Sequence, residues 1–340
     1  MDVDEPLLLF RAQYLQRMDH DFLTWPPPAL LRQPDAQSFL YKHAFDPSRL
    51  PHRPPVGYEK RVLKTLIARI QRAAGSNSAD GKPLQYLTSL LARLETTTAS
   101  PDSLAQQDAY ITYNCSTSLN TWHPVTLHES RSLISGSTHT GHRTWEGALH
   151  LASYLLGNPS LVSNKRVLEL GAGTGFLGIL CRKHLDARQV TATDGDEKVV
   201  DEMRENLELN GLKEDDAIAA RKLWWGKELL GDWQGCEHGS GFDTVIGADI
   251  IYQKEATQAL VEALRALLDL QPRARILLSN ALRFPDVFEI FRQECTRNSL
   301  SIHIVDYQVT PPPKQRSLFY STAMSLQIVE IRDWSEAKTP

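Results

Sequence analysis

The stretch Val-Leu-Glu-Leu-Gly-Ala-Gly-Thr-Gly-Phe-Leu-Gly, residues 167–178, decides the fold of this 340-residue chain. Its apolar beginning predicts a short buried strand, and the residues after the glycines predict a helix. Between them Gly171, Gly173 and Gly175 occupy alternate positions, and glycine lets the backbone turn sharply and approach a ligand closely. The stretch therefore predicts a strand, a turn and a helix, with a binding site at the turn.

The spacing of the glycines separates classes of ligand. A dinucleotide site has the pattern G-x-G-x-x-G/A, but Phe176 occupies its last position here. A phosphate-binding P-loop ends in Gly-Lys-Ser/Thr, and no such ending follows. The acidic Glu169, in the strand before the turn, suits a cationic nucleoside that carries an amino acid. These features favour S-adenosylmethionine, and the alternative is an ordinary turn between strand and helix.

Strands and helices alternate along the second part of the chain, from about residue 126. This alternation predicts an α/β domain with a doubly wound, mostly parallel, seven-stranded Rossmann-like sheet. The last two predicted strands have no helix between them, so we expect an antiparallel hairpin at one side of the sheet. The predicted strands cover residues 166–170, 190–193, 217–223, 242–248, 274–279, 301–309 and 323–331.

The first part of the chain, residues 1–125, is predicted to be helical. Leucine, isoleucine and valine recur at helical spacing over residues 62–70 and 84–94. We expect these apolar stripes to face a core, although one of them could dock a partner. The chain is therefore divided into a helical N-terminal region, 1–125, and an α/β domain, 126–340.

The composition excludes several classes of protein. The net charge of −4 gives no broad basic surface for nucleic acid, and no apolar run reaches the ~20 residues of a membrane-spanning helix. The N-terminus is acidic, unlike a secretory signal. Cys115, Cys181, Cys236 and Cys295 lie far apart, which favours reduced thiols inside the cell and predicts no metal site.

The ends of the predicted strands carry polar and aromatic residues. Asp194 ends the strand after the glycine turn and is expected to accept hydrogen bonds from ribose hydroxyls, with a helix N-cap as the alternative. Trp224 and Trp225 follow the next strand. Either ring could line an adenine pocket, or simply pack in the core.

The predicted strand at 242–248 is followed by Asp249 and, three residues later, Tyr252. A carboxylate at this edge can hold an acceptor amine, and a tyrosine ring can favour a cation. The alternative is an N-cap aspartate with a core tyrosine. Enzymes that methylate adenine or glutamine would carry Asn/Asp-Pro-Pro-Tyr/Phe here, and its absence argues against those substrates.

Taken together, these motifs resemble those of the seven-β-strand protein-lysine methyltransferases. The segment 141–149, which begins Gly-His-Arg-Thr-Trp-Glu-Gly, and the Asp-x-x-Tyr motif are the more specific parts of the resemblance. Within this family, the run 140–145 and the helical extension are similar to those of enzymes that methylate elongation factor 2. One departure is Trp224, where relatives often have aspartate.

The resemblance implies an S-adenosylmethionine-dependent methyltransferase domain over 126–340, with S-adenosylhomocysteine as the product. It implies a cytoplasmic, monomeric enzyme with elongation factor 2 as its protein substrate. Other hypotheses are methylation of another protein or a small molecule, and a non-catalytic module that binds the donor. Asp249 and Tyr252 would face the target lysine. Together with Glu169, the residues expected to bind the donor are Trp145, Gly171, Ala172, Gly173, Asp194, Trp225 and Ala248.

Overall fold

A computed structural model describes residues 3–75, 81–96, 108–130, 140–215, 217–226 and 241–334. The chain divides into two compact units, Met1–Ser137 and Thr138–Pro340. We call them the N-terminal and the C-terminal unit. The boundary expected at 125/126 falls inside strand β2 (Pro124–Glu129), so the N-terminal unit extends beyond the region taken from the sequence.

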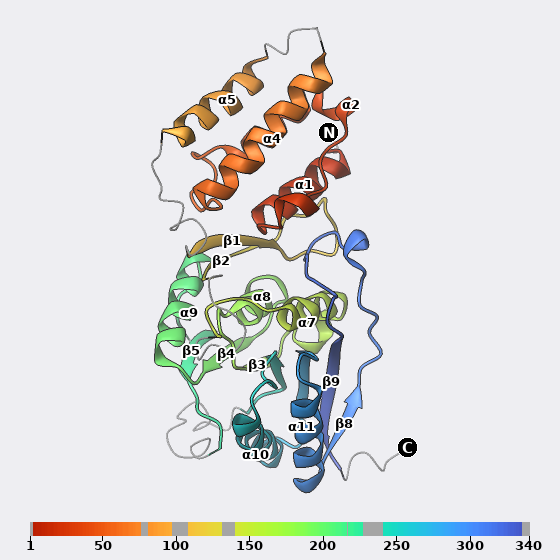
Figure 1. Ribbon diagram of the computed structural model, residues 1–340. Helices are drawn as coiled ribbons and strands as arrows, with labels where there is room; N and C mark the ends of the chain where they lie inside the picture. The colour runs from red at the N-terminus through yellow and green to blue at the C-terminus, as the bar shows by residue number, and fades with distance from the viewer. Residues whose placement is uncertain are drawn as a thin grey trace. The chain divides into compact units, whose positions relative to one another are not determined.

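The N-terminal unit is mainly helical, as expected (Figure 1). Both predicted stripes are buried: Leu63, Leu66 and Ile70 of α4 and Leu87 of α5 pack into one apolar core. Aromatic rings of other helices join that core. The helical elements are α1 (Glu5–Leu15), η1 (His20–Phe22), α2 (Pro28–Leu31), α3 (Pro34–Leu40), η2 (Tyr41–Phe45), α4 (Val56–Ala74) and α5 (Lys82–Glu95).

The N-terminal unit also contains a strand pair that the sequence analysis did not predict. β1 (Ala109–Asn114) runs antiparallel to β2, with Ile111 opposite Leu127 and Tyr113 opposite Val125. All four of these side chains are buried. The signal was present, because apolar and β-branched residues alternate along both segments.

The C-terminal unit has the predicted α/β fold. Its seven strands lie in the order β5-β4-β3-β6-β7-β9-β8, with parallel pairing from β5 to β7 and antiparallel pairing at β7-β9 and β9-β8. The strands are β3 (Arg166–Leu170), β4 (Gln189–Asp194), β5 (Ile218–Lys222), β6 (Thr244–Ala248), β7 (Arg275–Ala281), β8 (Leu300–Ile304) and β9 (Leu326–Asp333).

Helices cover both faces of this sheet (Figure 1). On one face, alternate residues such as Leu168, Val245 and Leu278 pack against the apolar stripe of α10 and the side of α11. α7, α8 and α9 cover the other face. The helices are α7 (Glu146–Gly157), α8 (Phe176–His184), α9 (Glu197–Leu209), α10 (Lys254–Leu270) and α11 (Pro285–Arg297), with the short turns η3 (Pro159–Leu161) and η5 (Pro312–Lys314).

The order of the strands positions the site. The chain runs outward from β3 to β4 and β5, then returns to β6 on the other side of β3. In such sheets, ligands bind at the carboxyl ends of the strands beside this reversal. β8 and β9 are antiparallel neighbours as expected, but a connection over residues 305–325 that includes η5 joins them instead of a tight turn.

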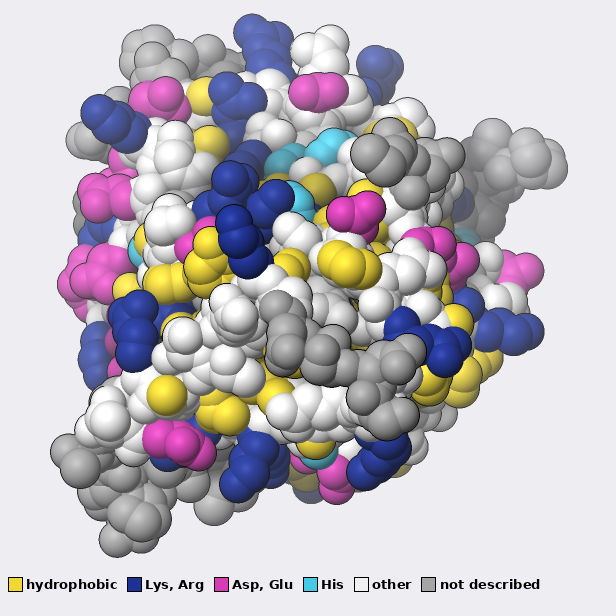
Figure 2. Space-filling model, turned by 90° about the horizontal axis from the view of Figure 1, so that it is seen from above, with side chains coloured by type: hydrophobic (Ala, Val, Ile, Leu, Met, Phe, Trp, Pro, Cys, Tyr) yellow, Lys and Arg dark blue, Asp and Glu magenta, His cyan; other side chains and the backbone are white. Residues whose placement is uncertain are grey.

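The surface and composition fit a folded globular chain. Charged and apolar side chains are interspersed on the face seen in Figure 2. None of the described helices is long and apolar enough to span a bilayer. Cys115, Cys181 and Cys295 are buried free thiols.

Candidate active site

The glycine turn after β3 has a backbone that only glycine adopts easily. Gly171, Gly173 and Gly175 have φ values of 60°, 54° and 79°, in the left-handed region. A Cβ on Gly173 would also lie 2.9 Å from the carbonyl oxygen of Gly141. The alternating glycines are therefore required by conformation and by space, and the turn leads directly into α8.

Asp194 lies at the carboxyl end of β4, against this turn. Its Oδ2 accepts a hydrogen bond from the Gly173 N–H at 3.0 Å, and its Oδ1 accepts one from the Asp196 N–H at 3.2 Å. Burial raises the pKa of the Asp194 carboxyl. The N-cap of α9 is Asp196, whose side chain accepts from the Lys198 N–H. The N-cap alternative for Asp194 is therefore wrong.

Glu169 lies beneath the turn and is almost fully buried. Its Oε2 accepts a hydrogen bond from the Gly178 N–H at 2.7 Å, within the first turn of α8. Burial raises the pKa of this carboxyl to about 8. The side chain therefore supports the start of α8 from the sheet, and a direct contact with a ligand stays a prediction.

The two tryptophans after β5 lie in different surroundings. Trp224 is 64% exposed, and its ring is next to Gly195. Trp225 is half-buried against the core, and its Cζ2 is 3.6 Å from where a Cβ on Gly171 would lie. Trp225 therefore stands over the first glycine of the turn.

The predicted alanines lie at the same edge of the sheet. The Ala172 N–H donates to the Thr193 carbonyl oxygen at 2.8 Å, which ties the turn to β4. Ala248 is the last residue of β6, the strand next to β3. The turn, Ala248 and the end of β4 are thus neighbours.

The segment 140–145 crosses the glycine turn. Gly141 contacts Gly173, and the Thr144 and Thr174 hydroxyls are 2.8 Å apart. The Trp145 indole N–H donates to the Thr140 carbonyl oxygen at 2.9 Å. The predicted Trp145 is in this way held beside the turn, immediately before α7.

Asp249 has an uncommon backbone conformation, and both oxygens of its carboxylate accept hydrogen bonds. Its φ is 52°, a left-handed value that aspartate tolerates better than most residues. Oδ2 accepts from the Gly147 N–H at 2.6 Å, and Oδ1 accepts from the Ala281 N–H at 2.8 Å and from Arg283 Nη1 at 3.1 Å. Burial raises the pKa of this carboxyl, and Arg283 opposes the shift.

These contacts exclude the alternative considered for the Asp-x-x-Tyr motif, an N-cap aspartate with a core tyrosine. The N-cap of α10 is Gln253, so Asp249 does not cap that helix. Tyr252 is 37% exposed and its hydroxyl lies 3.1 Å from the Thr140 hydroxyl, so it is not a core residue. Gly147 has no room for a Cβ, which would lie 2.6 Å from Oδ2 of Asp249. The Trp-Glu-Gly and Asp-x-x-Tyr motifs therefore meet in one contact.

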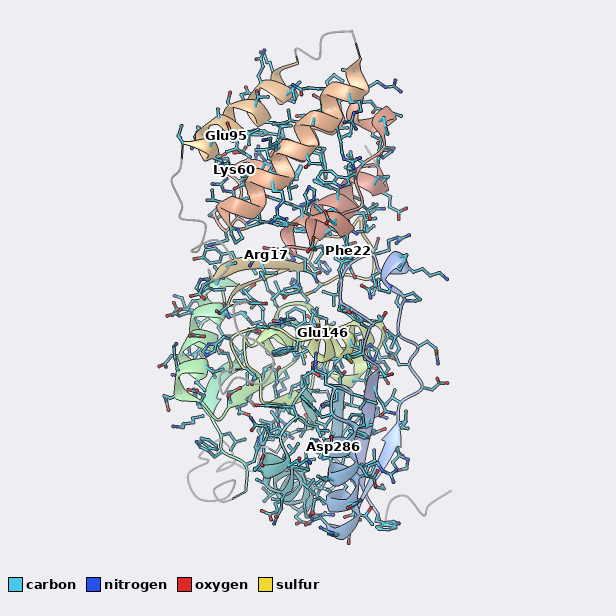
Figure 3. All side chains as sticks on the ribbon, viewed as in Figure 1. Arg17, Phe22, Lys60, Glu95, Glu146 and Asp286 are labelled. Carbon is cyan, nitrogen blue, oxygen red and sulfur yellow. The ribbon has the colours of Figure 1, made fainter. Side chains whose placement is uncertain are left out.

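Two charged residues that sequence reasoning missed complete this contact. Arg283, after β7, forms ion pairs with both Asp249 and Glu146, and Figure 3 labels Glu146 at the start of α7. Arg143 Nη2 is 3.6 Å from Glu146 Oε1, and the guanidinium carbon of Arg143 lies over the Trp145 ring, 4.2 Å from its centroid. No spacing rule links residue 146 to residue 283, so the sequence held no signal for this pair.

Known proteins are similar to this chain over most of its length. A model of a family described as lysine methyltransferase matches residues 130–289. A Chaetomium thermophilum protein named protein-lysine N-methyltransferase EFM3 is 37% identical, over 95% of this chain and 96% of its own length. The human protein-lysine N-methyltransferase EEF2KMT is 27% identical, over 87% of this chain and 85% of its own length. The chain belongs to the protein-lysine methyltransferase family.

The site residues fit the methyl donor that a methyltransferase uses. The three glycines of the turn carry no Cβ, so a ligand can approach the backbone closely, and the Asp194 carboxylate at its side can accept hydroxyl hydrogen bonds. Among the described residues there is no group of three or more His, Cys, Asp or Glu that could hold a metal ion. Independence from metal stays a prediction.

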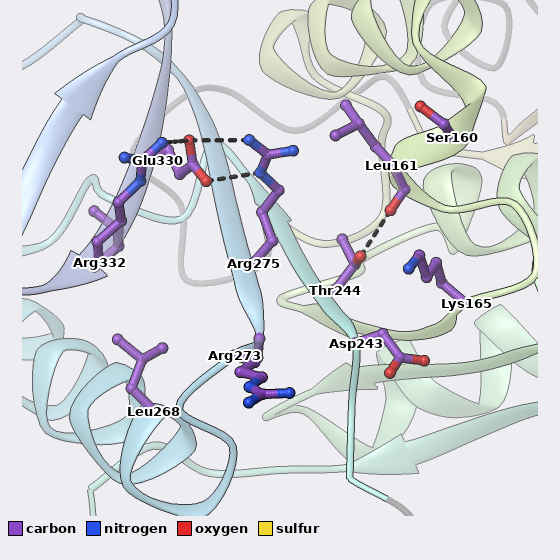
Figure 4. A pocket seen from close by; sticks show the side chains of 12 residues that line it. Ser160, Leu161, Lys165, Asp243, Thr244, Leu268, Arg273, Arg275, Glu330 and Arg332 are labelled. Carbon is purple, nitrogen blue, oxygen red and sulfur yellow. Dashed lines mark hydrogen bonds and ion pairs between the residues drawn. The ribbon is translucent and has the colours of Figure 1, made fainter. Parts of the chain in front are cut away.

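A cavity of about 390 Å³ lies at the opposite edge of the sheet from this methyltransferase site (Figure 4). It is next to the amino ends of β6 and β7, where Thr244 and Arg275 are paired in register. Glu330 bridges Arg275 and Arg332 beside it. None of the predicted site residues lines this cavity.

Proposed function

We propose that this chain transfers a methyl group from S-adenosylmethionine to a lysine of elongation factor 2, in the cytoplasm and as a monomer. The name of the human relative, EEF2KMT, supports this substrate. The observation that carries the proposal is structural. The glycine turn, Asp194 and the Asp249–Tyr252 motif lie at one edge of the sheet, in a chain 37% identical to a protein-lysine methyltransferase.

The site has two sides. We define the donor side as the glycine turn (171–175), Asp194, Trp145, Trp225 and Ala248. It would hold the donor through backbone N–H groups, a carboxylate for the ribose hydroxyls and an indole wall for the adenine. The donor supplies a methyl group on a positively charged sulfur. Glu169 supports this side from below by fixing the start of α8.

We define the acceptor side as Tyr252, Asp249 and the charged residues that hold Asp249. Tyr252, partly exposed, would line the entry for the lysine side chain, and its ring can stabilise a cationic group. Asp249 would shape the end of that entry. Methyl transfer is a displacement at carbon, so holding the amine in line with the methyl group and the leaving sulfur supplies much of the rate.

The test uses the full chain, labelled S-adenosylmethionine and a lysate from cells that lack the enzyme. Labelling of elongation factor 2 on one lysine, repeated with the purified factor, would support the proposal. Labelling of a different protein instead would show that the enzyme has another substrate. Donor binding without any labelled product would favour a non-catalytic binding module. Size-exclusion chromatography with light scattering would test the monomeric state, and fractionation the location.

We also propose that the N-terminal unit docks the protein substrate. Its apolar stripes are used in its own core, so docking would use its outer surface. Phe22 is a candidate because its side chain is 74% exposed. Phe22→Ser should raise KM for elongation factor 2 and leave kcat and donor affinity unchanged. Ile304→Ser, a matched change of an exposed apolar residue in the C-terminal unit, should leave KM unchanged. Equal KM values for both variants would contradict docking through Phe22.

A further inference from the structure

The guanidinium groups of Arg143 and Arg283 lie over the Trp145 ring and pair with the carboxylates of Glu146 and Asp249. We call Arg143, Glu146, Asp249 and Arg283 the charged cluster. They come from the start of α7, the end of β6 and the end of β7, so the cluster ties together three elements that meet at the site. The two guanidinium carbons lie 4.2 Å and 5.0 Å from the Trp145 ring centroid. The cluster is therefore part of the wall that an acceptor would meet.

The cluster carries no net charge. Arg283 pairs with both carboxylates, and Arg143 adds a second positive charge near Glu146. Asp249 is only 7% exposed, and two backbone N–H groups and Arg283 occupy its oxygens. A carboxylate held in this way is fixed in position, because three of its about four acceptor positions are already used.

We propose that Arg283 is the positioning residue of the acceptor site: its guanidinium neutralises Asp249, fixes it against α7, and favours the acceptor amine in its uncharged form. This inference rests on the proposed function, since it assumes that a lysine enters beside Asp249 and Tyr252. It extends that function, because Arg283 belongs to none of the motifs that identified the family.

The chemistry of the reaction explains why neutralisation matters. A lysine amine has an ordinary pKa of about 10.4 and is protonated near neutral pH. The transfer needs the nitrogen lone pair, so one proton must first leave to water. The N–C bond then forms while the C–S bond breaks, and its electron pair goes to the sulfur. An unpaired carboxylate beside the amine would retain the proton, whereas a nearby cation helps to release it.

Among the described residues, the titratable and charged groups of the acceptor side and the charged cluster come from three segments. Asp249 and Tyr252 follow β6, Arg283 follows β7, and Arg143 and Glu146 lie at the start of α7. Of these, Arg283 alone bonds both carboxylates. Removing its charge leaves Asp249 uncompensated, which raises the pKa of an incoming lysine and moves the rising limb of the pH–rate profile to higher pH.

The experiment compares three full-length variants with the wild type and measures kcat from pH 6 to 10 at saturating elongation factor 2 and S-adenosylmethionine, because kcat reports the pKa values of the enzyme–substrate complex. In Arg283→Gln we expect the midpoint of the rising limb to move up by about one pH unit or more. Arg283→Lys keeps the charge but loses the planar guanidinium that can pair with two carboxylates. The midpoint should therefore return to the wild-type pH, while kcat stays below the wild-type value. Arg292→Gln breaks an exposed pair on α11 and serves as the matched control, with an unchanged profile.

Donor affinity and thermal unfolding are measured for each variant, so that loss of the fold is recognised. An Arg283→Gln variant that is folded, binds S-adenosylhomocysteine normally and keeps the wild-type midpoint would overturn the inference. So would a lowered kcat with the same midpoint in Arg283→Gln and Arg283→Lys, because that result indicates packing alone. Failure of the wild type to methylate elongation factor 2 would instead refute the proposed function, which distinguishes the two.

Discussion

The donor and acceptor sides of the site lie at one edge of the same sheet but are built differently. On the donor side, the backbone of a single turn forms the surface, and three glycines with φ between 54° and 79° make it possible. On the acceptor side, side chains from residues 143 to 283 form the surface, and ion pairs hold it together. The turn that forms the centre of the donor side is local in sequence, whereas the acceptor side depends on the pairing of β6 with β7.

This difference determines which changes each side tolerates. The donor side has little space for a new Cβ but carries few charges that could be misplaced. The acceptor side depends on a balance of charges, in which removal of one partner leaves another buried and unpaired. Substitutions that add a side chain on the donor side should therefore lower donor affinity. Substitutions that remove a charge on the acceptor side should lower the rate of methyl transfer.

The largest effect is expected for Asp249→Ala. The change leaves Arg283 and two backbone N–H groups without their acceptor, and breaking a buried pair costs about 3–5 kcal/mol. We expect methyl transfer to fall by 100-fold or more, or about 2.7 kcal/mol and above, while S-adenosylhomocysteine binds within about tenfold of wild type.

Asp201→Ala provides the control for this variant, because Asp201 forms an exposed ion pair on α9. It should keep full activity. Normal turnover by Asp249→Ala, or an equal loss of donor binding and turnover, would remove the distinction between the two sides.

The next effect is expected for Gly173→Ala. Alanine at a left-handed φ costs about 1–2 kcal/mol, and its Cβ would meet the Gly141 carbonyl oxygen at 2.9 Å. Calorimetry should show donor affinity at least tenfold lower. Gly157→Ala is the matched control, because its Cβ would meet open space and its φ is not positive. If both variants bind alike, the turn does not contact the donor.

The same difference explains how much the sequence could predict. The strand predicted at 166–170 agrees with β3 at both ends, because its apolar residues and the glycines that follow them are local signals. The Glu146–Arg283 pair could not be found, since only the pairing of β6 with β7 brings its two segments together.

Two other differences have local causes. The β1–β2 pair was missed although its residues alternate, because the helical prediction for residues 1–125 was extended over β1 and the start of β2. Asp194 was weighed as an N-cap because it ends a strand before a helix, yet Asp196 is two residues nearer and takes that role.

A smaller effect is expected for Tyr252→Phe. The ring stays in place at the entry, and only the hydrogen bond with Thr140 at 3.1 Å is lost. An exposed hydrogen bond contributes about 0.5–1.5 kcal/mol, so we expect kcat/KM to fall severalfold without a change in donor affinity. Tyr86→Phe, an exposed tyrosine of the N-terminal unit, should show no change. A 100-fold loss for Tyr252→Phe would mean that the hydroxyl itself takes part in the transfer.

The smallest effect concerns Glu169→Gln and is seen only as pH varies. The pKa of Glu169 is raised from 4.5 to about 8 by burial, so the folded chain holds a proton that the unfolded chain has released. This contribution to stability is complete below about pH 4.5 and is lost as pH rises through about 8. Glutamine can still accept from the Gly178 N–H.

The unfolding temperatures of wild type and Glu169→Gln should therefore diverge between pH 5 and pH 9, because the variant loses less stability as pH rises. Arg292→Gln again provides a surface control with the wild-type pH dependence. Parallel curves for wild type and Glu169→Gln would show that Glu169 is ionised in the folded chain.

The position of β9 has a consequence for how the protein is made. β9 follows β8 in sequence and is the last of the described strands, yet it lies between β7 and β8 and pairs with both. During synthesis β8 therefore has no partner in the sheet, and the edge of β7 stays open, until residues 326–333 leave the ribosome. A chain cut short by a premature stop after β8 would expose that edge, where unpaired backbone groups favour aggregation. The sheet of the C-terminal unit can therefore be completed only after residues 326–333 have been synthesised.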